Sequence, residues 1–241
     1  MRYPKPLIPA TLLRRYRRFL ADVQLPDGRE ITVHCPNTGR LLGCCAPGMR
    51  VWLSHHDAKN RKYAHTWELV EVEGVMVGIN TALPNRLVAE SLAQGHIPPL
   101  ARYCHQRREV AYGNRSRVDF VLEDDAGGVC HLEVKNVNAA VSRGIALFPD
   151  AVTARGTRHL QDLAQVVAQG GRSVIFFCVQ RGDVTEVRPA DAIDPVYGQT
   201  LRQVLGVGVE AMAFDTHVSP EGVWLRREVA VVCPALTDAN D

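Results

Sequence analysis

Residues 131–138, HLEVKNVN, carry an acid and a lysine two positions apart in a run that is typical of a β-strand. Alternate side chains of a strand share a face, so Glu133 and Lys135 point one way while Leu132 and Val134 point the other way. A carboxylate beside an ammonium can position and stabilise a reacting group. The same spacing is common on the wet face of ordinary strands, so on its own it leaves both interpretations open.

Two further acids fall on the neighbouring predicted strands. Asp119 interrupts the apolar run VDFVL, and Glu109 lies ten residues before it. Carboxylates that converge at one sheet edge repel each other unless a cation lies between them, and Mg²⁺ or Mn²⁺ suits such oxygen ligands. We therefore predict that Glu109, Asp119 and Glu133 hold the metal. Asp119, Glu133 and Lys135 would form the catalytic set for phosphodiester hydrolysis, with the lysine assisting the attacking water or stabilising phosphate charge.

Lysine rather than arginine at position 135 favours a functional site over a solvent-exposed strand face. The chain has 28 basic residues, of which 24 are Arg and only 4 are Lys, and no lysine other than Lys135 follows position 62. A compact ammonium and a planar guanidinium are not interchangeable where geometry is tight. A lone lysine in an arginine-rich chain thus indicates a position where arginine would not serve.

These residues need a sheet with helices to position them, and the second part of the chain predicts one. The run SVIFFCV at 173–179 is continuously apolar, as expected of a buried central strand. Strands and helices together predict a mixed α/β domain over residues 84–241. We expect helices at 82–95, 150–170 and 195–205, and strands at 108–113, 116–123, 129–137, 173–179, 208–214 and 223–232.

Residues 1–83 predict a separate small β-barrel. Short alternating strands are separated by turn signals such as Pro26-Asp27-Gly28, which is typical of an oligonucleotide-binding (OB) barrel, with an SH3-like barrel as the alternative. We expect strands at 17–25, 29–35, 49–56, 63–72 and 75–81.

The barrel segment is basic, and its first residues contain the run RRYRRF. Residues 1–83 hold 12 Lys and Arg against 7 Asp and Glu, whereas residues 84–241 hold 16 against 19. Arginines bind phosphates and aromatic rings stack on bases, so this segment predicts contact with nucleic acid. The alternative is a solvated basic face. The predicted contacts are Arg14, Arg15, Tyr16, Arg17 and Arg18.

Two other segments bear on the site without defining its chemistry. On the predicted helix at 150–170, Arg155 and His159 are one turn apart and are predicted to line the cleft and hold phosphates, while Asp150 is expected to cap the helix. In HCPNTGRL, at 34–41, Asn37 suits a tight turn. The backbone N–H groups of this turn either bind a phosphate or have only a structural role.

Five long blocks carry a resemblance to the bacterial sugar fermentation stimulation protein A family: residues 12–39, 61–70, 109–120, 132–137 and 148–163. The resemblance implies an N-terminal OB-like domain joined to a nuclease-like domain of the PD-(D/E)XK type. It also implies DNA binding and a link to maltose and sugar use. Within that motif it assigns Asp119, Glu133 and Lys135, with Glu109 as an earlier acid.

Composition narrows the remaining possibilities. No apolar run approaches the ~20 residues of a membrane helix, and the first residues contain no signal-peptide pattern. The seven cysteines include no C-x-x-C pair and predict reduced thiols, so we expect a cytoplasmic protein.

Taken together, the sequence predicts a DNA-binding protein of low sequence preference with a Mg²⁺- or Mn²⁺-dependent nuclease domain. A non-catalytic regulator of sugar genes, or an enzyme acting on another phosphorylated substrate, remains the alternative.

Overall fold

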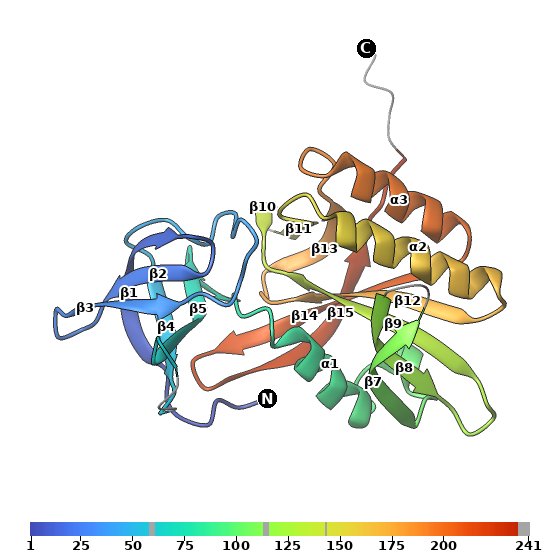
Figure 1. Cartoon of the computed structure of the whole chain (residues 1–241), viewed down its shortest axis with the longest axis horizontal. Helices are drawn as coiled ribbons and strands as arrows, with labels where there is room; N and C mark the ends of the chain where they lie inside the picture. The colour runs from blue at the N-terminus through green and yellow to red at the C-terminus, as the bar shows by residue number, and fades with distance from the viewer. Residues whose placement is uncertain (58–60, 113–115, 143, 236–241) are drawn as a thin grey trace, which may run out of the picture.

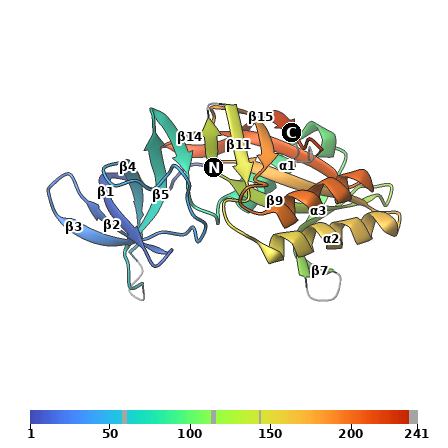
Figure 2. The ribbon, with the colours of Figure 1, turned by 90° about the horizontal axis from the view of Figure 1, so that it is seen from above.

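Two β-sheets of different size organise the chain. The computed structural model describes residues 1–57, 61–112, 116–142 and 144–235 of the 241. A six-stranded sheet is built from the N-terminal third and a nine-stranded sheet from the remainder. They form two adjoining units with the blue and cyan barrel on one side and the larger unit on the other (Figures 1 and 2).

The N-terminal sheet closes into a barrel, as predicted. Its strand order is β3-β2-β1-β4-β5-β6, and a further parallel pairing between β3 and β5 closes the first five strands of that order into the barrel. The interior is filled by inward-facing side chains such as Leu12, Val33, Val51 and Trp67, all fully buried. The strands are β1 (Ile8–Tyr16), β2 (Leu20–Gln24), β3 (Glu30–His34), β4 (Arg50–His55), β5 (His65–Val72) and β6 (Val75–Gly78).

Within the barrel, strand β1 was not predicted from the sequence. The predicted first strand began at Arg17, but Arg17 and Arg18 have φ values of 49° and 62° and form the turn between β1 and β2. Strand β1 pairs with β2 on one side and with β4 on the other. The basic run therefore occupies the end of a central strand and the tip of its hairpin.

The second sheet is mixed, as predicted. Its order is β10-β11-β13-β15-β14-β12-β9-β8-β7, and β12 pairs in parallel with both β9 and β14. The short strands β10, β11 and β13 were not predicted. The strands are β7 (His105–Tyr112), β8 (Ser116–Glu123), β9 (Val129–Val137), β10 (Ala140–Ser142), β11 (Gly144–Phe148), β12 (Arg172–Val179), β13 (Val184–Pro189), β14 (Glu210–Ser219) and β15 (Gly222–Val231).

Helices cover both faces of this sheet, which explains the continuous apolar run of β12. Helices α2 (Ala154–Ala168) and α3 (Pro195–Gly206) lie side by side on one face, and α1 (Pro84–Ala93) lies on the other (Figure 1). Phe176 packs in the core on the α1 side, whereas Ile175 and Phe177 pack in the core on the α2 and α3 side. A short 3-10 helix, Pro98–Leu100, follows α1. No helix among the described residues is long and apolar enough to cross a membrane.

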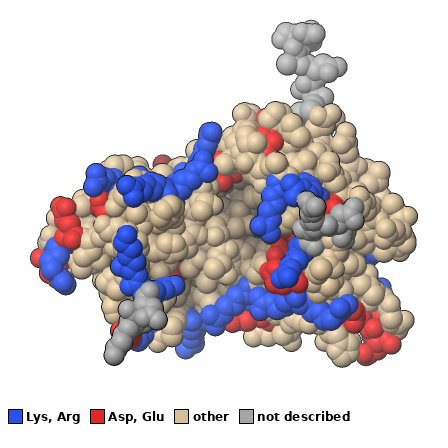
Figure 3. Space-filling model, in the orientation of Figure 1, with Lys and Arg blue, Asp and Glu red and all other residues tan. Residues whose placement is uncertain are grey.

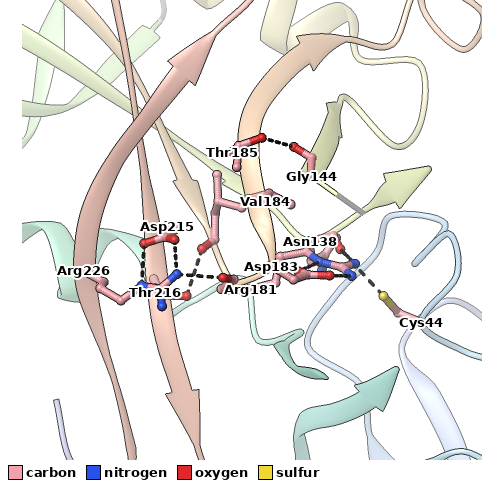
Figure 4. A network of polar contacts seen from close by, with 12 residues as sticks. Cys44, Asn138, Gly144, Arg181, Asp183, Val184, Thr185, Asp215, Thr216 and Arg226 are labelled. Atoms are coloured by element: carbon pink, nitrogen blue, oxygen red, sulfur yellow. Dashed lines mark hydrogen bonds and ion pairs between the residues drawn. The ribbon is translucent and has the colours of Figure 1, made fainter. Parts of the chain in front are cut away.

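Buried polar contacts join the two units. Gln180 accepts a backbone hydrogen bond from Gly78 at 2.8 Å and donates its amide to the carbonyl of Asn80 at 3.1 Å. Next to it, the buried Arg181 pairs with Asp183 and donates to the carbonyl of Asn138 (Figure 4). The Gln180 contacts would be lost if the units separated, so they resist separation, whereas the Arg181 contacts lie within the larger unit and hold its surface at the interface in place.

Candidate active site between the two units

The acid pair lies where strand β8 separates from β9. Pairing between these strands runs from Glu123 and Val129 as far as Phe120 and Leu132, and then stops. The next N–H of β9 that needs a partner, on Val134, donates instead to Asp119 Oδ2 at 2.7 Å. The side chain of Asp119 thus replaces the missing backbone acceptor, and this brings it beside Glu133.

Glu133 is the centre of the polar cluster and is only 2% exposed. Its Oε1 accepts a hydrogen bond from Lys135 Nζ at 2.7 Å and lies against Nδ1 of His159. Arg155 Nε donates to His159 Nε2 at 3.2 Å, which leaves the ring proton on Nδ1, facing the carboxylate. The other oxygen, Glu133 Oε2, is buried and makes no hydrogen bond within the described part of the chain.

The two carboxyl groups have pKa values shifted in opposite directions. Burial raises the pKa of Asp119, the neighbouring Glu133 carboxylate adds to the rise, and hydrogen bonds from Val134 and Asn85 only partly oppose it. Burial also acts to raise the pKa of Glu133, but the hydrogen bond from His159 and the ammonium of Lys135 outweigh it, so this pKa falls below its ordinary value. The cluster therefore stabilises a negative charge at Glu133, whereas a negative charge at Asp119 is not fully compensated by the groups around it.

The cluster opens into a cavity of about 460 Å³ whose walls come from both units. The barrel contributes Arg18 and the loop at Asn37, Thr38 and Gly39, while the larger unit contributes the acid pair, Lys135 and the start of α2. Figure 3 shows the surface hollowed between the two units, with basic side chains beside the hollow. A phosphate group in this cavity would meet cationic groups from both sides.

Glu109 is a predicted metal ligand that the structure does not bring to this cavity. Arg108 pairs with Phe120 and Val110 with Val118, but Glu109 between them has a φ of 51°, so the regular alternation of side chains is broken there. Its side chain is exposed and does not line the cavity. The expectation of three converging carboxylates is therefore corrected to two, Asp119 and Glu133.

The predicted arginines of the basic run divide into different roles. Arg14 pairs with Asp22 at 2.8 Å, and the hydroxyl of Tyr16 donates to the same carboxylate at 3.0 Å. Arg15 donates to the carbonyls of Asn37 and Gly39, at 2.7 and 2.8 Å, and so holds the loop that walls the cavity. Of the run, only Arg18 lines the cavity, and Arg17 is exposed outside it.

Of the three residues predicted at the start of helix α2, two lie at the cavity as expected and Asp150 does not cap the helix. Arg155 and His159 both line the cavity, and His159 contacts Glu133 directly. Asp150 does not cap α2, because Thr153 is the N-cap and accepts from the N–H of Gly156 at 3.0 Å. Asp150 instead accepts a hydrogen bond from the N–H of Leu41 across the interface.

A cavity residue that contacts the acid pair was not predicted from the sequence. Asn85, in the first turn of α1, donates its amide to Asp119 Oδ1 at 2.7 Å and lines the cavity. Its position directly after Pro84 marks a helix start, but this local signal does not reveal which carboxylate the helix will meet. The asparagine at position 37 forms the turn that its sequence predicted, because its Oδ1 accepts from the N–H of Gly39.

A closed barrel joined to a mixed sheet that carries an acid pair and a lysine on adjacent strands defines an OB domain followed by a restriction-endonuclease-like (RE) domain. Both predicted fold assignments are thereby confirmed. The family model for the SfsA N-terminal OB domain matches residues 13–79, and that for the sugar fermentation stimulation protein RE domain matches residues 82–222. The chain belongs to the sugar fermentation stimulation protein (SfsA) family.

Relatives in this family match over nearly the whole chain. Sugar fermentation stimulation protein homologs from Thioalkalivibrio sulfidiphilus and Alkalilimnicola ehrlichii are 57% and 55% identical, covering 96% and 97% of this chain and 98% and 100% of their own. The solved structure of Pyrococcus furiosus SfsA in complex with Ca²⁺ is 27% identical, with a TM-score of 0.87. That match covers 96% of this chain and 98% of the solved one.

Proposed function

We infer that the cavity between the two domains hydrolyses phosphodiester bonds of DNA in the presence of Mg²⁺ or Mn²⁺. The observation that carries this inference is the pair Asp119 and Glu133 beside Lys135, with Glu133 Oε2 buried and lacking a hydrogen-bond partner in the described residues. A buried carboxylate oxygen without a donor is costly unless a ligand meets it. Two carboxylates and a neighbouring ammonium provide the charges that phosphodiester cleavage requires.

A divalent cation fits this donor set. Asp119 and Glu133 would hold it, because both are carboxylates in one cavity, and Mg²⁺ and Mn²⁺ prefer such oxygen ligands together with water and phosphate. The Ca²⁺ complex of Pyrococcus furiosus SfsA, a 27% identical relative of the same fold, supports divalent metal binding. When bound, the ion supplies positive charge that favours attack on a phosphodiester.

The chain's own residues bind and orient the substrate. Lys135 Nζ, held at 2.7 Å from Glu133 Oε1, can donate to a water molecule or to a non-bridging phosphate oxygen. Arg155 and Arg18 line the cavity from the two domains and would hold phosphates of the strand. None of these contacts reads a base edge, so the grip would tolerate different sequences.

The decisive experiment incubates the pure protein with end-labelled single- and double-stranded DNA, with and without Mn²⁺. The wild type should cut, whereas Lys135→Arg should retain binding and lose cutting, because a guanidinium is wider than an ammonium and does not exchange protons near neutral pH. Glu133→Gln should also fail, and Glu109→Gln, changed outside the cavity, is the matched control that should cut normally. Equal cutting by wild type and Lys135→Arg would remove the lysine from the mechanism.

A DNA-binding regulator that does not cut is the second candidate. The observation that favours it is the name shared by its relatives, which refers to stimulation of sugar fermentation rather than to cleavage. The regulator is the better explanation if the wild type binds DNA but cuts neither single- nor double-stranded DNA with any divalent metal.

Two further statements remain predictions: the boundary between the domains at residues 83 and 84, and a cytoplasmic location.

A further inference from the structure

A second pocket, of about 260 Å³, lies against helix α2. Its walls come from the end of β7, from β9 and from α2, and it shares no lining residue with the cavity described above. The polar residues in its wall are Tyr112, His131, Asp162, Gln165 and Gln169.

Three polar atoms in this wall are buried without a hydrogen-bond partner in the described residues. They are the hydroxyl of Tyr112, Nδ1 of His131 and Oδ2 of Asp162. Buried polar side-chain atoms are nearly always paired, either within the protein or with a bound molecule. The three atoms belong to side chains that line one pocket and come from three separate elements, which indicates a site for a ligand that carries complementary donors and acceptors.

The pocket and the acid pair are built on the same two elements, strand β9 and helix α2. His131 and Glu133 share a face of β9, about 6.6 Å apart along the strand. On α2, Asp162 follows His159 by three residues, which puts them on neighbouring positions of one helix face. Burial raises the pKa of Tyr112, and the charges of Glu133, Asp162 and Asp119 raise it further, so its hydroxyl lies within their field. A strand held at the acid pair could therefore place an adjacent nucleotide in this pocket.

The lining favours a planar, neutral ligand with N–H donors. The rings of Tyr112 and His131 lie 5.8 Å apart with an angle of 33° between their planes, and such rings offer faces on which a base can stack. The carboxylate of Asp162 only accepts hydrogen bonds, so it selects a base with an amino group and disfavours one whose edge presents carbonyls. The volume of about 260 Å³ is large enough for one base.

We propose that this pocket binds a single unpaired nucleobase bearing an amino group, next to the phosphate that the arginines and Lys135 hold in the cavity of Asp119 and Glu133. The inference rests on the proposed function for the position of the strand, but the pocket itself can be tested with nucleosides alone. Guanine, whose edge carries adjacent imino and amino donors, fits Asp162 best, and thymine, with no amino group, fits worst.

The test measures the melting temperature of the protein, without metal, in the presence of guanosine, cytidine, adenosine or thymidine. A nucleoside at tens of times its dissociation constant should raise the melting temperature by about 4–8 °C. Guanosine should do so, and thymidine should not. Asp162→Asn and, independently, Gln165→Ala should reduce the guanosine response, whereas Asp125→Asn, on an exposed turn away from the pocket, should leave it unchanged.

The outcomes separate this pocket from the nuclease proposal. A guanosine response that both pocket variants weaken supports the pocket, whether or not DNA is cut. Absence of a response to every nucleoside, or an equal response to thymidine, overturns the proposal and leaves a pocket that holds only water, even if DNA is cut with Mn²⁺. A guanosine response that survives in both variants overturns it too, because the base then binds elsewhere.

Discussion

The carboxylate of Asp150 accepts a hydrogen bond from the backbone N–H of Leu41, 3.0 Å away, although the two residues are 109 positions apart. Asp150 precedes helix α2 in the nuclease-like domain, and Leu41 follows the loop of the OB domain that lines the cavity. This contact fixes one wall of the cavity against the other. The cavity is therefore a product of both domains, and its shape depends on their contact.

Gly39 is predicted to be required at this contact. A Cβ at position 39 would lie much closer to the carboxylate oxygens of Asp150 than van der Waals contact allows, so Gly39→Ala must displace that side chain. We expect a loss of about 1–2 kcal/mol in the free energy of unfolding and weaker DNA binding. Urea denaturation measures the first, and Gly206→Ala, where a Cβ meets nothing nearby, is the control.

A double-mutant cycle with Asp150→Ala tests the cause of that loss. If the clash is the reason, Gly39→Ala should cost little in the Asp150→Ala background, giving an interaction energy of about 1 kcal/mol. Additive losses would mean that position 39 matters for another reason, such as its turn.

Arg15 and Arg18 are predicted to respond differently to removal. Arg15→Ala loses the hydrogen bonds that hold the carbonyls of Asn37 and Gly39, so it should lower the free energy of unfolding by about 1–3 kcal/mol. Arg18→Ala should leave stability unchanged but weaken DNA binding and reduce the slope of log K against log salt by about 1. Arg17→Ala, exposed outside the cavity, is the control, and a loss of slope there as large as at Arg18 would contradict the assignment.

Divalent metal is predicted to stabilise the protein through Asp119 and Glu133. At a hundred times its dissociation constant, Mn²⁺ should add about 2.7 kcal/mol to the free energy of unfolding. Glu133→Gln should lose this response, because the ligand charge is gone, and Glu109→Gln should keep it. Thermal melting with and without Mn²⁺ provides the measurement, and a response of equal size in all three proteins would rule out this metal site.

Much of the fold was predictable because its strands carry strong periodic or continuous apolar patterns. Strand β12 was predicted from its continuous apolar run. The run is continuous because both faces of the strand are buried under helices. Strand β1 was missed because its end, LLRRY, looks polar and basic, and its two pairings with β2 and β4 are set by the tertiary structure. Propensity and local pattern do not contain that information.

The candidate site was predictable only where strand alternation holds. Glu133 and Lys135 share a face of β9 and meet at 2.7 Å, as their spacing indicates. Glu109 was not placed correctly because its own positive φ breaks the alternation of side chains in β7. Nothing in the surrounding sequence indicates that this residue adopts a positive φ. Asn85 was not found because it reaches Asp119 through the docking of helix α1, which is a contact across 34 residues of chain.

The buried Glu68 predicts a pH dependence of stability that is separate from the metal site. It lies on β5, only 5% exposed, and accepts hydrogen bonds from Ser54 Oγ and Asn80 Nδ2, both at 2.7 Å. Burial nevertheless raises its pKa above the ordinary value, since those two bonds only partly offset the loss of water. The protonated form is thus favoured by folding.

A raised pKa in the folded state means that Glu68 contributes stability fully below the unfolded-state pKa of about 4.3, and loses that contribution as the pH rises through the folded pKa. We therefore expect wild type to lose stability relative to Glu68→Gln between pH 4.5 and neutrality, because glutamine is neutral throughout. Urea unfolding of both proteins at a series of pH values gives the difference, and the exposed Glu30→Gln is the control, which should follow the wild type. A difference between wild type and Glu68→Gln that stays constant with pH would show that the carboxylate at position 68 remains ionised in the folded protein at no cost from its burial.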